Sequence, residues 1–208
     1  YKENGFKKKE DAERLIAELT AEPAGPVTVT GIEKKKENKN APLLYNLAEL
    51  QNDCSKYFKI SPDETLRIVQ ELYEKKMTTY PRTDARVLST AVAKEIHKNI
   101  GGLRSYALAT PFAKEVLEQG TYKNIAKTRY VNDKQITDHY AIIPTGQGLN
   151  NLAGLAPTAA KVYEVIVRRF LSIFYPPAVY QKFSLAVKVK EENFFASFKV
   201  LVQEGYLL

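Results

Sequence analysis

The spacing of apolar and polar residues changes along the chain from alternating to helical and back to alternating. Within residues 10–20 the apolar positions fall on one face at helical spacing, which predicts a short helix. The stretch 27–36, VTVTGIEKKK, alternates with a period of two and is rich in β-branched residues, which predicts a strand. The charged run at 34–40 is expected to be a polar linker.

From residue 41 the pattern becomes helical. Residues 43–58 carry apolar side chains at helical spacing, and a second helix is expected from Ser61, which can cap it. Pro62 then takes the first helical position and Glu64 completes a capping box. Further helices are expected at 89–101 with Ser89 as cap, at 110–120 with Thr110 as cap, and at 157–175 before two prolines.

A period of two returns after the prolines. Residues 178–190 and 194–203 read as two strands joined by the charged turn EEN. We therefore expect an α+β fold, in which a helical domain at 41–177 is inserted into a β-rich, antiparallel domain. Residues 1–40 and 178–208 are expected to form the two parts of that β-rich domain.

Composition narrows the classes of function. The 208 residues carry a formal net charge of +7, which favours polyanions, nucleic acid first and anionic membranes second. No apolar run reaches the roughly 18 residues of a membrane span. The single cysteine, Cys54, excludes an internal disulfide and fits a reducing cytoplasm. With only His97 and His139 besides, no metal-ligand set is expected within the chain.

The start of the chain, YKENGFKKKE, has neither a methionine nor the apolar core of a signal peptide. We therefore expect the sequence to be a piece of a longer protein.

The stretch TTYPRTD, residues 78–84, gathers candidate chemistry. Tyr80 precedes Pro81, which keeps it out of a regular helix. A phenol with a pKa of about 10 is a weak nucleophile, but the guanidinium of Arg82 would favour the phenolate and can hold a phosphate. Asp84 could orient Arg82. The alternative is a turn aromatic beside a surface ion pair worth under about 1 kcal/mol.

Two other stretches contain polar groups of interest. In TDHYAIIPTG, Asp138 lies beside His139 and could tune a histidine that serves phosphates. The alternative is a helix-capping aspartate and a packed histidine. In APLLYNLAELQ, Gln51 extends from a helix near Asn46, and alone this is an ordinary amphipathic helix. His97, inside another amphipathic helix, is assigned a structural role.

Taken together, the three stretches resemble a known family. LYEKKMTTYPRTD resembles the active-site segment of the type IA DNA topoisomerases, most closely the topoisomerase III branch, LYEKKxxTYPR followed by Ser or Thr and Asp. DHYAIIPTG resembles the DHHAIIPT box of that branch, and PLLYNLAELQ its PLPFxLxxLQ box. Order and spacing also agree, and the resemblance spans roughly residues 28–208.

The resemblance implies a role for each matching residue. Tyr80 would be the nucleophile that cleaves single-stranded DNA and keeps the 5′-phosphate, before strand passage and religation without ATP. Arg82 would contact the scissile phosphate, and His139 would lie close to the phosphates. Supporting or DNA-binding roles would fall to Thr83, Asp84, Asp138 and Gln51.

The resemblance also implies what lies outside this chain. The family's Mg²⁺ site is on a Toprim domain, whose Asp-x-Asp signature is absent here, so the chain is expected to bind no metal and to be inactive alone. The helical domain is expected to have a winged-helix-like core, and a helicase is a possible partner of the full-length enzyme. The expected location is the cytoplasm, at the nucleoid.

Two positions depart from the family pattern. Ala85 stands where Ser or Cys is usual, so a local hydrogen bond is expected to be absent. Tyr140 replaces the second histidine of the DHH pair, which removes a titratable group.

Three other functions stay open on the residues alone. The first is a non-catalytic winged-helix-type DNA-binding module, in which a basic helix sets affinity. The second is a replication-initiator nuclease, although such enzymes generally need a histidine metal cluster. The third is a structural interaction domain, which salt-insensitive or absent DNA binding would favour.

Overall fold

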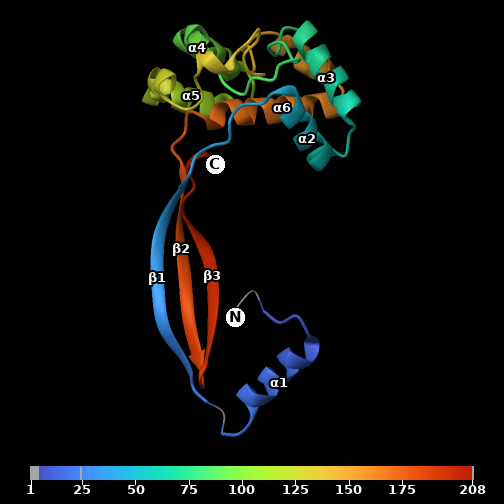
Figure 1. Ribbon diagram of the computed structural model, residues 1–208. Helices are drawn as coiled ribbons and strands as arrows, with labels where there is room; N and C mark the ends of the chain where they lie inside the picture. Colours follow the sequence, from blue (N-terminus) through green and yellow to red (C-terminus); the bar gives the residue numbers. More distant parts are fainter. Residues whose placement is uncertain (1–4, 24, 208) are drawn as a thin grey trace. The chain divides into compact units, whose positions relative to one another are not determined.

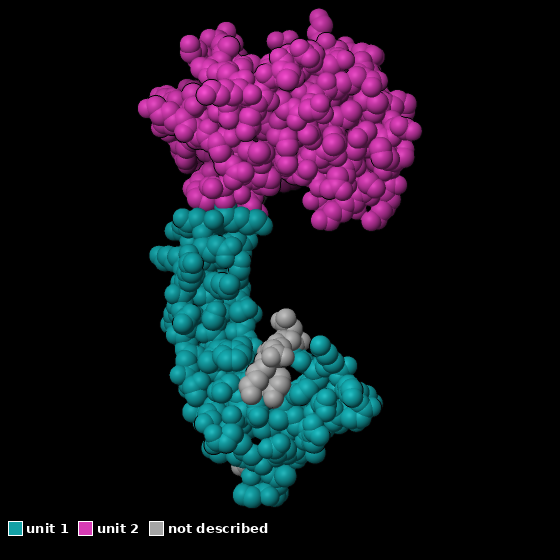
Figure 2. All heavy atoms as spheres, viewed as in Figure 1, with its two compact units in different colours: residues 1–39, 178–204 teal, residues 40–177, 205–208 magenta. Residues whose placement is uncertain are grey.

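The computed structural model describes residues 5–23 and 25–207, and the chain divides into two compact units (Figure 2). The first unit comprises residues 1–39 and 178–204, and the second comprises residues 40–177 and 205–208. The chain is therefore a mixture of an antiparallel sheet and helices, with the helical unit between two parts of the sheet unit. The β-rich domain was expected to continue to residue 208, but it ends at residue 204. The residues from 205 onward belong to the helical unit, because Tyr206 packs against its core.

The first unit is built on a three-stranded antiparallel sheet of order β1-β2-β3 (Figure 1). Because β1 pairs with β2, segments from the two ends of the sequence lie side by side, as the inserted arrangement requires. The elements are α1 (Lys9–Thr20), β1 (Val27–Lys39), β2 (Ala178–Val189) and β3 (Glu192–Gln203).

Two details of the sheet correct the sequence prediction. The charged run at 34–40 is not a linker, since residues through Lys39 pair with β2. Pairing with β2 hydrogen-bonds the backbone groups on one side of this run, while its charged side chains remain exposed to solvent. The EEN turn is also displaced: Glu192 already pairs with Val189, and Lys190 adopts a left-handed φ of 50° in the turn.

The helical unit contains five α-helices among the described residues, joined by short 3-10 turns. The α-helices are α2 (Leu47–Phe58), α3 (Pro62–Glu74), α4 (Thr90–Gly102), α5 (Thr110–Gln119) and α6 (Pro157–Ser172). The 3-10 turns are η2 (Leu103–Ser105), η3 (Thr121–Lys127), η4 (Asp133–Gln135), η5 (Leu149–Gly154) and η6 (Gly205–Leu207). No helix in this described part is both long and apolar enough to cross a membrane.

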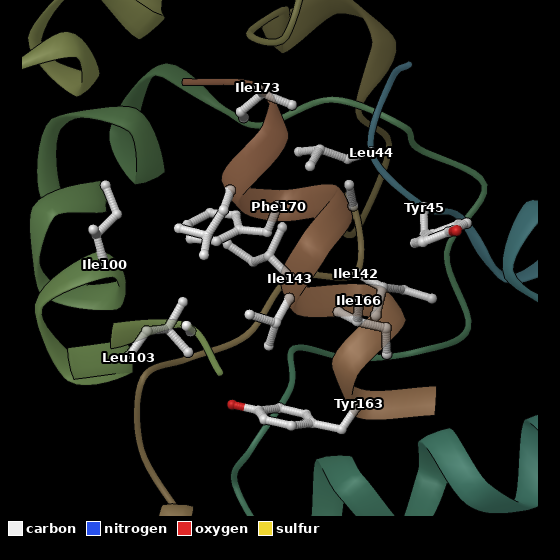
Figure 3. Close-up of a cluster of buried hydrophobic side chains, with 14 of the residues drawn as sticks. Leu44, Tyr45, Ile100, Leu103, Ile142, Ile143, Tyr163, Ile166, Phe170 and Ile173 are labelled. Atoms are coloured by element: carbon white, nitrogen blue, oxygen red, sulfur yellow. The ribbon is translucent and has the colours of Figure 1, made fainter. Parts of the chain in front are cut away.

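Helix α6 supplies much of the core of this unit. Tyr163, Ile166 and Phe170 of α6 are fully buried. Side chains from α4, η2 and two extended segments surround them (Figure 3): Leu44, Tyr45, Ile100, Leu103, Ile142 and Ile143. The segments that carry the candidate motifs are thus tied into the hydrophobic core.

Helix starts follow the capping signals at some positions and not at others. Ser61 caps α3 as predicted, with its hydroxyl accepting a bond from the Glu64 amide at 3.1 Å. Helix α2 begins at Leu47 rather than at residue 43, because the Asn46 side chain caps it. Thr110 does not cap α5: its hydroxyl donates to carbonyls of the preceding turn, and Ala109 takes the cap position without a side-chain bond.

Candidate functional site

The segment that carries Tyr80 runs extended between α3 and α4 and is bonded to the segment that carries His139. The Thr79 amide donates to the carbonyl of Ile143 at 3.0 Å. The Thr79 hydroxyl donates to the carbonyl of Ala141 and accepts from the Ile143 amide, both at 3.0 Å. These bonds bring together two motifs that lie about sixty residues apart in the sequence.

Two aromatic rings contact the ring of Tyr80. The ring centroid of His139 lies 4.3 Å away at an interplanar angle of 40°. The ring of Tyr73, on α3, lies 5.5 Å away at 81°, an edge-to-face arrangement. Tyr80 is half-buried and Pro81 after it is buried, so backbone and ring are both restrained.

Thr83 forms hydrogen bonds with residues of all three motifs. This residue is buried, and its hydroxyl donates to the carbonyl of His139 at 2.9 Å and accepts from the Ala85 amide at 3.1 Å. Its carbonyl accepts from the amide of Leu47, the first residue of α2. The three motifs therefore meet at Thr83, and its hydroxyl satisfies the backbone at the departing position Ala85.

The segment before α2 is anchored by a buried ionic network. The Tyr45 hydroxyl donates to a carboxylate oxygen of Asp53 at 2.6 Å, and Arg169 of α6 donates to the same oxygen at 2.9 Å. The guanidinium also lies over the Tyr45 ring, 4.0 Å from its centroid. Because the Tyr45 carbonyl accepts from the Ile142 amide at 2.8 Å, the network supports the strand beside the candidate site.

Tyr80 opens on a cleft with a volume of about 520 Å³. Every residue of its lining carries a polar group, and the lining comprises Tyr73, Glu74, Lys76, Thr78, Thr79, Tyr80, His139, Tyr140, Thr145 and Gln147. Burial raises the pKa of the Tyr140 phenol above its ordinary value, so this side chain stays neutral where a histidine would titrate. The Thr78 hydroxyl is buried and has no hydrogen-bond partner within the described part of the chain.

The remaining predicted site residues lie outside this lining. Arg82 and Asp84 are exposed, and no ion pair joins their side chains among the residues described. Asp138 is exposed as well. Gln51 donates to the carbonyl of Pro62 at 3.0 Å, so its amide links α2 to the start of α3. The roles given to these four residues stay predictions.

His97, which was assigned a structural role, is exposed on α4, and its ring lies 6.4 Å from that of Tyr122.

Three residues of the cleft had no role in the sequence interpretation. They are Tyr73 on α3, and Lys76 and Thr79 in the segment that follows it. Lys76 adopts a left-handed φ of 61°, which nothing in its residue type signals. All three residues lie within the motif LYEKKMTTY, residues 72–80. The resemblance of this motif to the family pattern is therefore the sequence feature that could have identified them.

A second hollow of the helical unit, of about 300 Å³, is lined mainly by aromatic and aliphatic side chains such as Tyr106, Phe112 and Tyr175, and contains none of the predicted site residues. Over residues 5–23 and 25–207, no group of three or more His, Cys, Asp or Glu side chains could hold a metal ion.

Comparisons with known proteins bear on the whole chain. A protein-family model described as DNA topoisomerase matches residues 1–208. DNA topoisomerase 3 of Bacillus cereus is 36% identical over 201 residues, which is 95% of this chain and 26% of that protein. DNA topoisomerase 3 of Bacillus subtilis is 34% identical over 194 residues, 93% of this chain and 26% of that protein. The chain therefore spans about a quarter of the length of these relatives.

A solved structure supports the fold. Full-length topoisomerase I from Thermotoga maritima matches 99% of this chain and 32% of its own, with a TM-score of 0.65 at 20% sequence identity.

Proposed function

This chain belongs to the type IA DNA topoisomerases and is topoisomerase III-like, and from that premise we propose that Tyr80 is its nucleophile. The Tyr80 oxygen attacks a phosphodiester of single-stranded DNA as its proton leaves. The phosphorus–O3′ bond breaks, the 3′ oxygen takes up a proton, and the 5′-phosphate stays on tyrosine. After strand passage the 3′-hydroxyl attacks the phosphotyrosine and restores both groups. No ATP is needed, because the covalent bond conserves the energy of the phosphodiester.

The observation that carries this proposal is the arrangement of Tyr80 itself. Its backbone is restrained by the hydrogen bonds of Thr79 and by Pro81, and its ring contacts the rings of Tyr73 and His139 where it lines the cleft. A half-buried phenol in this position has a restrained ring, and single-stranded DNA can still reach its hydroxyl. Positioning of this kind is a large part of what a covalent catalyst contributes.

Arg82 and His139 take the phosphate roles in this proposal. The exposed guanidinium of Arg82 follows the nucleophile by two residues and would hold the scissile phosphate in two hydrogen bonds. His139, in ring contact with Tyr80, would donate a hydrogen bond to the phosphate or move a proton. Thr83 holds the backbone of His139, while Asp84, Asp138 and Gln51 would support the DNA groove.

The residues present do not fit a magnesium ion, since no suitable group of ligands exists in the described part of the chain. We propose that the chain is the central part of a longer enzyme whose Mg²⁺ site lies on another part of that enzyme. The chain alone is then expected not to relax supercoiled plasmid. Single-stranded DNA is the proposed partner, with a helicase partner for the longer enzyme in the cytoplasm.

We also propose that the core of the helical unit is winged-helix-like. Helix α3 packs against both α2 and α6, and short antiparallel bridges join Tyr45 to Ile142 and Thr78 to Pro144.

The test is Tyr80→Phe in the complete enzyme, assayed with a 5′-labelled and a 3′-labelled single-stranded oligonucleotide after denaturant quench. The label 3′ of the cleaved bond should become protein-linked in the unaltered enzyme and stay free in the variant, with DNA binding retained. Tyr140→Phe is the matched control, because it removes another phenol of the same cleft. Adducts that persisted in Tyr80→Phe would refute the assignment.

A further inference from the structure

The chain reverses after α3 at a lysine in an unusual conformation. Lys76 has a left-handed φ of 61°. The Lys76 amide donates to the carbonyl of Tyr73 at 2.8 Å and the Met77 amide to that of Leu72 at 2.9 Å, the paired bonds of a helix terminus that ordinarily carries glycine. A strained residue at a candidate site is a reason to look for a function of its side chain.

The charge of Lys76 is not used within the described part of the chain. Its neighbour Lys75 pairs with Glu71 at 3.1 Å, whereas the ammonium of Lys76 makes no ion pair or hydrogen bond there. Lys76 nevertheless lines the same cleft as Tyr80, and the Thr145 hydroxyl fixes its carbonyl at 2.5 Å.

Glu74 also lines the cleft, and it accepts a hydrogen bond from Gln70 at 3.2 Å. Among the residues that the structure describes, the cleft therefore contains a lysine whose ammonium has no ion pair or hydrogen bond and a carboxylate that accepts one hydrogen bond.

We propose that Lys76 binds a phosphate of the single-stranded DNA, one adjacent to the phosphate that Tyr80 attacks. The inference rests on the proposed function and adds a contact that orients the strand in the cleft. In that function Arg82 holds the scissile phosphate, so the adjacent phosphate can be bound by a second cation, and Lys76 lines the same cleft. An ammonium on a flexible stem suits a phosphate whose position varies with base sequence.

The chain contains a matched control. Lys59 ends α2 in the same left-handed conformation, with φ of 59°, but its ammonium donates to the carbonyl of Lys56 at 3.0 Å and does not line the cleft. Lys59→Gly and Lys76→Gly remove the same charge and relieve the same backbone strain. Any difference between them in DNA binding therefore belongs to the position of Lys76.

The experiment measures binding of a fluorescent single-stranded oligonucleotide to the 208-residue chain by anisotropy, over a series of salt concentrations. Lys76→Gly should lose about fivefold in affinity at low salt, and the slope of log K against log salt should fall by about 0.7, one phosphate contact. Lys59→Gly should match the unaltered chain, and Lys76→Arg should restore both quantities. Thermal unfolding should show that neither glycine variant has a lowered midpoint.

Equal affinity and slope in Lys76→Gly and Lys59→Gly would overturn the inference, as would a lack of salt-dependent binding by the unaltered chain. Failure of the proposed function has a different signature. If Tyr80 is not the nucleophile, adducts persist in Tyr80→Phe whatever Lys76 does to the salt slope.

Discussion

Asp53 is expected to hold the segment APLLYNLAELQ, residues 41–51, in place through its bond to Tyr45. Asp53→Ala should therefore be strongly destabilising. Its carboxylate accepts bonds from Tyr45 at 2.6 Å and Arg169 at 2.9 Å, and the Arg169 and Asp53 side chains are only 13% and 11% exposed. Hydrogen bonds to charged groups contribute about 1.5–3 kcal/mol each. Breaking a buried pair leaves its partner's charge uncompensated, at a cost of about 3–5 kcal/mol. We therefore expect Asp53→Ala to lower the free energy of unfolding by about 3–5 kcal/mol.

Circular dichroism during thermal and urea unfolding of the 208-residue chain measures the loss. For a chain of this size the predicted change lowers the helical transition by about 10 °C. Asp63→Ala is the control, because Asp63 is exposed in the first turn of α3 and should cost at most about 1 kcal/mol. If the two variants unfolded within about 2 °C of one another, the network would not anchor the segment and the reasoning would fail.

Two further predictions concern single side chains. Tyr73→Ala should lower the rate of DNA cleavage by the complete enzyme about fivefold at unchanged oligonucleotide affinity, since the edge contact with Tyr80 is worth about 1 kcal/mol. Tyr73→Phe should restore the rate, and equal rates in all three proteins would show that Tyr73 does not position Tyr80. Cys54 is fully buried and burial raises the pKa of its thiol to about 11, so a thiol reagent at pH 8 should label it only in denaturant; rapid labelling of the native chain would contradict this.

Much of the fold could be predicted because local signals agreed with the tertiary structure. Ser61, Pro62 and Glu64 marked the start of α3 correctly, and Gly120 ends α5 with a left-handed φ of 67° as a C-terminal glycine should. Where signals competed, the prediction failed. The run at 34–40 is polar enough for a linker, but pairing with β2 makes it a strand. This pairing joins residues that lie far apart in the sequence, so the local residue pattern does not reveal it.

For the candidate site, the sequence predicted which residues take part but not how they are arranged in space. The identities of Tyr80, Arg82 and His139 came from motifs. Their grouping depends on bonds that join Thr79 to Ile143 and Thr83 to His139, across more than fifty residues of sequence. The conformation of Lys76 was equally invisible, because lysine carries no preference for a left-handed φ.

Identifying the amino acid that carries the DNA tests most directly whether Tyr80 is the nucleophile. The covalent complex of the complete enzyme with a short oligonucleotide would be trapped, digested with trypsin and nuclease, and sequenced by mass spectrometry. Trypsin releases Met77–Arg82, MTTYPR, in which Tyr80 is the one tyrosine, whereas Tyr73 and Tyr140 fall on other peptides. We predict that the nucleotide is attached to Tyr80 of this peptide. A nucleotide on Tyr73, Tyr140 or any other residue would contradict it.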